Sequence, residues 1–169
     1  MSITRSPFRA APAIELSDLR DTVLLLLGHG SARDEGPARA LQEQAGLLGE
    51  RLGCSGLAVA TLEGEPGLRA ALHLATGRRA LVLPILMADG WTFRERLPVD
   101  LAKALQDGGP DEIAVCAPIG LARELAPMIA ARATREAERR GWSASQCTLL
   151  LVAHGTKRDG NSYRATERH

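Results

Sequence analysis

Two histidines stand in nearly identical surroundings, each after a short apolar run and before a glycine and a hydroxyl residue. His29 lies in LLLLGHGS and His154 in LLLVAHGT. The glycine allows the chain to turn away sharply and lets a flat ligand approach closely. A neutral imidazole can bind a divalent iron, cobalt or nickel ion, and it can accept a proton near neutral pH. His29 and His154 are therefore the candidate catalytic residues and metal ligands.

The similarity between the two histidine motifs extends well beyond the histidines. LLLLGHGSARDEGPARA, which starts at Leu24, aligns without a gap with LLLVAHGTKRDGNSYRA, which starts at Leu149, and polar positions match as well as apolar ones. We interpret the match as an internal duplication. A lone histidine at a strand end is more often a structural residue, but its repetition favours a functional role. The second repeat contains only a strand, a loop and the start of a helix.

The elements around these motifs alternate between apolar runs and amphipathic segments. Strands are expected over 22–29, 56–63, 79–87, 112–119 and 147–154, and helices over 37–52, 66–77, 98–106 and 121–141. Apolar strands joined by helices predict an α/β fold with a parallel sheet. Ligands of such sheets bind beyond the carboxyl ends of the strands, where both histidines would lie.

The chain divides into three parts in this interpretation. Residues 1–18 form a flexible leader, residues 19–143 form an α/β domain, and residues 144–169 begin a second, repeated lobe. An incomplete lobe would need a homodimer partner or a missing second lobe to cover its apolar face.

Composition excludes several partners. The formal net charge of +1 gives no global field toward nucleic acid or an anionic membrane. The longest apolar run is far shorter than the ~18 residues of a membrane span, and the first residues lack the apolar core of a signal peptide, so a cytoplasmic location is expected. Neither a GxxxxGK[ST] loop nor a GxGxxG fingerprint occurs, so no nucleotide is expected.

Four segments, in the expected order, resemble the sirohydrochlorin chelatases of the CbiX type. They are VLLLLGHGSARDE, LEGEPGLRAAL, RALVLPILMADGWTFRERLP and CAPIGLARELAPMIAARA. The resemblance implies a chelatase-like three-layer sandwich with a four-stranded parallel sheet, plus the first strand and helix start of a second similar lobe. It also implies a lyase that inserts a divalent metal substrate into sirohydrochlorin, with cobalt and iron as the main candidates and nickel as a third. That tetrapyrrole serves cobalamin and sirohaem biosynthesis.

One loop departs from the family pattern. Where the family has a second histidine and an acid, this chain has Thr92 and Arg96. Two explanations stay open. Either His154 is the working ligand and its partner lies beyond residue 169, or His29 works with a substitute ligand, for which the candidates are Glu63, Glu65 and Met87.

The other residues expected to contact a tetrapyrrole surround the same sheet edge. They are Ser31, Arg33, Glu63, Glu65, Trp91, Thr92 and Arg94. For Ser31 and the nearby Asp34, capping of the following helix is at least as good an interpretation. Arg94 and Arg96 could pair with substrate carboxylates through charge-assisted bonds or simply be solvated.

Two other functions use His29 differently. A non-catalytic tetrapyrrole or metal carrier needs no proton acceptor. Thr92, which stands where the family has a second histidine, favours this carrier function. A phosphotransfer enzyme with a nucleophilic histidine would need arginines immediately around it, whereas Gly28 precedes His29.

Overall fold

The computed structural model describes residues 16–52, 54–153 and 160–167. The described chain begins with a 3-10 turn, η1 (Leu16–Asp21), which leads into the first strand. Residues 16–18, which the sequence analysis assigned to the leader, lie in this turn. The rest of the predicted leader is outside the described residues.

Four parallel strands form the sheet. They are β1 (Thr22–Gly30), β2 (Gly56–Glu63), β3 (Arg79–Pro84) and β4 (Glu112–Val115), in the order β2-β1-β3-β4. The predicted α/β class with a four-stranded parallel sheet is confirmed. The predicted third and fourth strands end earlier than expected, at Pro84 and Val115.

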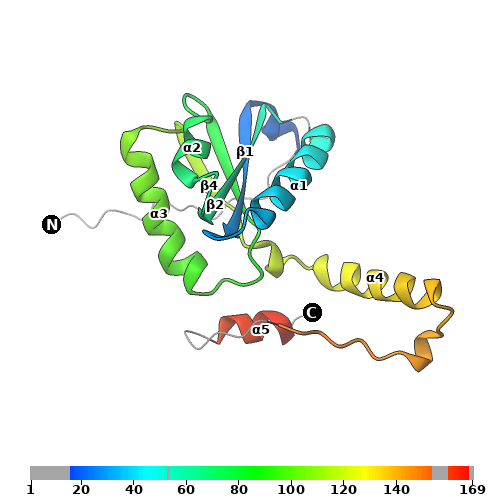
Figure 1. Cartoon of the computed structure of the whole chain (residues 1–169). Helices are drawn as coiled ribbons and strands as arrows, with labels where there is room; N and C mark the ends of the chain where they lie inside the picture. Colours follow the sequence, from blue (N-terminus) through cyan, green and yellow to red (C-terminus); the bar gives the residue numbers. More distant parts are fainter. Residues whose placement is uncertain (1–15, 53, 154–159, 168–169) are drawn as a thin grey trace.

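Helices lie on both faces of the sheet and make three layers (Figure 1). One face carries α1 (Gly36–Leu52), and the other carries α2 (Leu68–His73) and α3 (Leu97–Ala104). Strand β1 is buried on both faces because its side chains alternate: Leu25 and Leu27 join the core under α2 and α3, while Leu24 and Leu26 join the core under α1. This central strand therefore fixes the position of the residues at its carboxyl end.

Short turns connect the remaining elements. They are the π-helical turn η2 (Thr92–Arg96) directly before α3, the 3-10 turns η3 (Leu105–Asp107) and η4 (Ile119–Leu121), and η5 (Ala144–Gln146). Residues 92–96 were predicted as loop. They instead continue without a break into α3, so that a single helical segment starts at the edge of the sheet.

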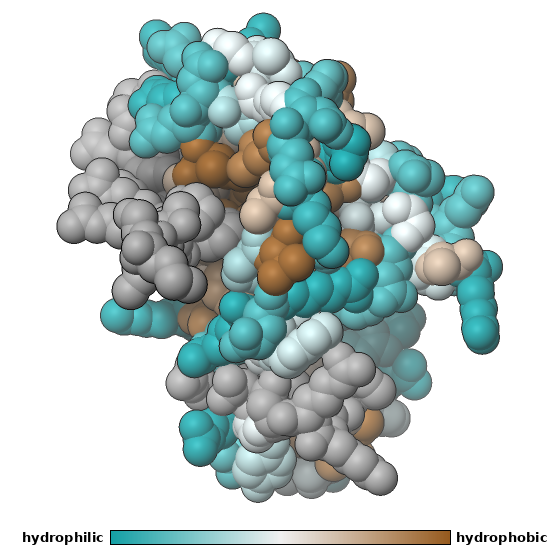
Figure 2. All heavy atoms as spheres, turned by 90° about the vertical axis from the view of Figure 1, so that its left-hand side faces the viewer, coloured by the Kyte–Doolittle hydropathy of each residue, from teal (hydrophilic) through white to brown (hydrophobic). Residues whose placement is uncertain are grey.

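The last two helices are α4 (Leu125–Arg139) and α5 (Asn161–Glu167). None of the residues of α4 is buried, and the helix extends away from the sheet beyond η4 (Figure 1). The predicted helix over 121–141 is thus shorter, because residues 119–121 form a 3-10 turn. On the side shown in Figure 2, apolar side chains also reach the surface between charged ones.

The predicted fifth strand is wrong for the residues that the structure describes. Residues 147–153 form no strand, and Leu150 and Val152 are 79% and 87% exposed. A strand needs a neighbour to satisfy its backbone N–H and C=O groups, and residues 147–153 pair with none of the four strands. His154 lies outside the described residues, so the division of the chain at residue 144 stays a prediction.

No helix in the described ranges is both long and apolar enough to cross a bilayer.

Candidate functional site

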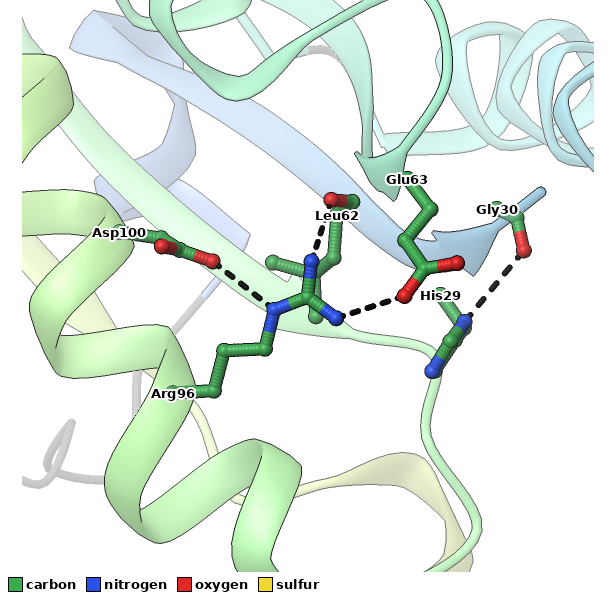
Figure 3. Close-up of polar contacts among 6 residues, drawn as sticks. All are labelled: His29, Gly30, Leu62, Glu63, Arg96 and Asp100. Carbon is green, nitrogen blue, oxygen red and sulfur yellow. Dashed lines mark hydrogen bonds and ion pairs between the residues drawn. The ribbon is translucent and has the colours of Figure 1, made fainter. Parts of the chain in front are cut away.

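His29 lies at the carboxyl end of the central strand, one residue before β1 ends at Gly30. Its side chain is exposed, whereas residues 22–27 of the same strand are buried. The imidazole Nδ1 is 3.4 Å from the carbonyl oxygen of Gly30, and the other ring nitrogen points away from that carbonyl (Figure 3). The structure therefore presents a histidine nitrogen at the edge where ligands of parallel sheets bind.

Gly30 brings the ends of β1 and β2 together. Its backbone has φ +73°, a conformation that glycine adopts readily and other residues do not. A Cβ at this position would lie 2.1 Å from the carbonyl oxygen of Glu63, the residue paired with Gly30 in the sheet. Only a residue without a side chain permits this approach, and it sets Glu63 beside His29.

Arg96 connects the carboxyl end of β2 to the start of α3 (Figure 3). Its Nη1 donates to Glu63 Oε1 at 2.8 Å, and its Nη2 donates to the carbonyl oxygen of Leu62 at 2.8 Å. Its Nε donates to Asp100 Oδ2 at 3.1 Å, one turn further along α3. The guanidinium thus joins two carboxylates and one backbone carbonyl.

This arrangement makes Glu63 a persistent anion. The hydrogen bond from Arg96 lowers the pKa of Glu63 below its ordinary value, and the nearby positive charge of a protonated His29 lowers it further. The contact with Glu63 also raises the pKa of Arg96. The site therefore contains an exposed imidazole, a carboxylate beside it and a fixed guanidinium behind the carboxylate.

Two of the predicted substrate contacts, Ser31 and Glu65, have local structural partners, and so does Asp34. Ser31 Oγ accepts a hydrogen bond from the backbone N–H of Arg33 at 3.2 Å, and Asp34 Oδ1 accepts one from Gly36 at 2.9 Å, where α1 begins. Glu65 Oε2 accepts a hydrogen bond from the backbone N–H of Gly67 at 2.7 Å, directly before α2. The capping interpretation agrees with the contact of Asp34, and Glu65 has a similar role before α2, whereas Ser31 bonds within the loop that precedes α1. Arg33 itself has an exposed side chain near His29 in sequence.

The loop after β3 carries the remaining predicted residues. Arg94 forms an ion pair with Asp89 and also donates from Nε to the Asp89 carbonyl oxygen at 2.7 Å. Trp91 is 42% exposed, and the half-buried Thr92 begins η2 one turn before Arg96. Thr92 and Arg96 thus lie along the same turn of helix.

Of the three substitute metal ligands considered, Glu63 is the one placed next to His29. The carboxylate of Glu65 is engaged at the start of α2, and Met87 is exposed in the loop after β3. Within the part of the chain that the structure describes, no group of three or more histidine, cysteine, aspartate or glutamate side chains could hold a metal ion. His29 and Glu63 therefore form an incomplete pair of donors, and His154 remains untested.

Asp100 was not among the predicted site residues, and Arg96 has other partners than those predicted. Arg96 was expected to meet substrate carboxylates or solvent, but it pairs with carboxylates of the protein. The four-residue spacing between Arg96 and Asp100 on one helix is a signal that was available. The pairing with Glu63 spans 33 positions and depends on the tertiary fold.

Comparison with known proteins gives consistent matches. The family model CbiX matches residues 23–136. A protein of Halobacterium salinarum named "Probable sirohydrochlorin cobaltochelatase" is 24% identical, over 86% of this chain and 56% of that protein. This chain thus spans little more than half of that relative.

Two solved structures are similar. A protein of Marinobacter aquaeolei VT8 named "Putative cobalamin (vitamin B12) biosynthesis CbiX protein" is 25% identical with a TM-score of 0.60, over 71% of this chain and 98% of that one. CbiX described as the terminal enzyme of sirohaem biosynthesis in denitrifying bacteria is 30% identical with a TM-score of 0.66, over 86% of this chain and 61% of that one.

Proposed function

Because the chain belongs to the CbiX family, we propose that it acts as a tetrapyrrole metal chelatase, a lyase-type enzyme that inserts Co²⁺ or Fe²⁺ into sirohydrochlorin. Two proteins support this proposal by their names, the halobacterial cobaltochelatase and the terminal enzyme of sirohaem biosynthesis. The reaction would belong to cobalamin or sirohaem biosynthesis. The observation that carries the proposal is the exposed His29 imidazole beside the Glu63 carboxylate at the carboxyl edge of the sheet.

Metal insertion requires the loss of two pyrrole protons as the metal ion binds the four ring nitrogens. A neutral imidazole with one nitrogen directed toward the ligand side can accept such a proton or hold the incoming ion. The anionic Glu63 stabilises the imidazolium that forms, because opposite charges attract across the short separation of the two side chains. The metal ion is a substrate of this reaction.

Binding of the tetrapyrrole is proposed to use residues at the same edge. Trp91 offers an exposed indole face on which a flat macrocycle can stack. Arg33 offers an exposed guanidinium for a substrate carboxylate. Thr92 and Arg94 follow Trp91 on the approach to α3, and Ser31 and Glu65 lie in the loops after β1 and β2.

A second candidate is a non-catalytic tetrapyrrole-binding or metal-binding module of the same fold. The observation that favours it is the ion pair between Arg96 and Glu63, because Oε1 of the carboxylate next to His29 is already bonded to a protein cation. Thr92 in the place of a second histidine points the same way, since a hydroxyl is a poor ligand for these metals.

An insertion assay separates the two candidates. The chain is mixed with sirohydrochlorin and Co²⁺ or Fe²⁺, and the change in visible absorbance is followed for wild type, His29→Ala, His154→Ala and a sample without protein. His73→Ala on α2 is the matched control, because it removes an exposed imidazole that contributes nothing to the proposed site.

The chelatase proposal predicts that His29→Ala slows insertion at least ~10-fold, the lower range for loss of a general base, while His73→Ala keeps the wild-type rate. Equal rates for wild type, His29→Ala and the sample without protein would refute it. Sirohydrochlorin binding by wild type without acceleration of insertion would instead support the carrier.

A further inference from the structure

The Arg96 side chain is held in place rather than loosely solvated. All three of its nitrogens donate hydrogen bonds, to Glu63, the Leu62 carbonyl oxygen and Asp100, at 2.8 to 3.1 Å. The side chain is only 25% exposed, whereas the Arg94 side chain on the same turn is 59% exposed. A guanidinium is always protonated, so a fixed positive charge lies on the far side of Glu63 from His29 (Figure 3).

A divalent ion bound between His29 and Glu63 would have to lie close to this charge. Metal–ligand bonds to imidazole and carboxylate are about 2.0–2.2 Å long, so the ion would be roughly 5 Å from the guanidinium. At that separation the repulsion between a +2 and a +1 charge weakens binding at least ~10-fold even at the dielectric constant of water. The hydrogen bond to Nη1 also uses one lone pair of Glu63 Oε1, which makes that oxygen a weaker metal ligand than the other one.

In the part of the chain that the structure describes, no further donor compensates for this loss. The position where a second histidine was expected holds Thr92, and among the described residues no cluster of three donors contains His29 and Glu63. Asp100, the nearest additional carboxylate of the network, is itself bonded to Arg96 at Nε.

We propose that Arg96 is a specificity residue that keeps divalent metal ions off the His29–Glu63 pair when no tetrapyrrole is bound. The Arg96 guanidinium supplies the positive charge beside Glu63 that a bound metal ion would otherwise supply, and Glu63 serves as its counter-ion. Within the proposed function, on which this consequence rests, the His29 imidazole then stays free to accept pyrrole protons, and the metal ion reaches the macrocycle from elsewhere.

Metal binding without tetrapyrrole tests the proposal directly. The metal-free chain is titrated with Co²⁺, whose visible absorption reports imidazole and carboxylate ligands, for wild type, Arg96→Gln and Arg96→Lys. Each is compared with its own His29→Ala counterpart, which removes the contribution of other histidines. Circular dichroism verifies that every variant is folded.

The charge argument predicts three results. Wild type and His29→Ala bind Co²⁺ with equal affinity. Arg96→Gln binds Co²⁺ at least ~10-fold more tightly than wild type does, and this gain is lost when His29 is also replaced by alanine. The Co²⁺ affinity of Arg96→Lys stays within about threefold of wild type, because lysine keeps the positive charge. If Arg96→Gln unfolds, the variant Arg96→Gln/Asp100→Asn replaces it, because it leaves no unpaired carboxylate on α3.

Three outcomes would overturn the inference. They are His29-dependent Co²⁺ binding in wild type as tight as in Arg96→Gln, no gain in Arg96→Gln, and an equal gain in Arg96→Lys. These outcomes are independent of the insertion assay, because no tetrapyrrole is present. A chain that fails to insert metal can still show the predicted titrations, and an active chelatase can still fail to show them.

Discussion

Replacement of Gly30 by alanine tests whether the close approach of β1 and β2 builds the site. An alanine Cβ at this position would lie 2.1 Å from the carbonyl oxygen of Glu63 and 2.5 Å from the Cβ of Thr61. Both distances are below any normal contact, and Thr61 is buried at 3% exposure, so the strand ends must separate. The change would therefore shift Glu63 away from His29 as well as weaken the fold.

Gly77 provides a matched control. Its φ is +70°, almost the same as the +73° of Gly30, but a Cβ at Gly77 would have no atom within 4 Å. Both alanine variants pay about 1–2 kcal/mol for the left-handed backbone, and both lose the same flexibility from the unfolded chain. The difference between the two variants therefore isolates the steric contact at Gly30.

Forcing additional atoms into a closely packed region typically costs about 1–3 kcal/mol. We expect Gly30→Ala to lower the free energy of unfolding by that amount more than Gly77→Ala does. This is a large part of the roughly 5–15 kcal/mol total stability of a domain. Urea unfolding followed by far-ultraviolet circular dichroism, with linear extrapolation to water, measures the difference.

A difference below ~0.5 kcal/mol between Gly30→Ala and Gly77→Ala would show that β1 and β2 part without cost, since that is the usual range of surface substitutions. The reasoning about the origin of the His29–Glu63 pair would then be wrong.

Two further predictions concern the core and the ion pair. Leu101→Ala should lower the free energy of unfolding by about 2–5 kcal/mol, because the Leu101 side chain on α3 is completely buried against the sheet. Val99 lies on the same helix but is 51% exposed, so Val99→Ala should change the free energy of unfolding by less than ~0.5 kcal/mol. Urea unfolding measures both variants. Glu63→Gln should lower the melting temperature at neutral pH but not in acid. The pKa of Glu63 is lower in the folded chain than its ordinary value of 4.5, so its carboxylate stabilises the fold above that value and loses this effect as the pH falls through the lowered pKa. The gap between the melting temperatures of wild type and variant should narrow as the pH falls below 4.5, and a gap that stays constant with pH would contradict the assignment.

The periodicity of apolar residues was sufficient to predict the sheet. Strand β1 has a continuous apolar run, which is typical of a strand covered on both faces, and the structure buries it on both faces. The same reasoning failed at residues 147–153, whose apolar run is as strong. A pattern of side chains indicates that a segment can form a strand, but whether a neighbouring strand is available depends on the rest of the fold.

The site was predictable in part. The exposed position of His29 followed from its place at the end of an apolar strand, before a glycine. Glu63 was one of three open candidates, because sequence could not show that Gly30 pairs with Glu63 in the sheet while Glu65 turns back to the start of α2. The role of Arg96 was out of reach for the same reason, since its partner Glu63 lies on another element.

The residues that position the His29 and Glu63 side chains differ from the residues that control the affinity of these side chains for a metal ion. His29 and Glu63 are brought together by the pairing of β1 with β2 and by Gly30, and no residue of α3 takes part in that pairing. Thr92 and Arg96 lie on the helical segment that faces the pair, and its attachment to the core comes from other residues, the fully buried Leu97 and Leu101. Substitutions at positions 92 and 96 can therefore change the charge and ligands around the imidazole while the sheet and the core stay the same. Substitutions within one turn of helix are thus sufficient to change a lobe of this fold from binding a metal ion to excluding it. In this chain Arg96 supplies the charge that excludes the ion.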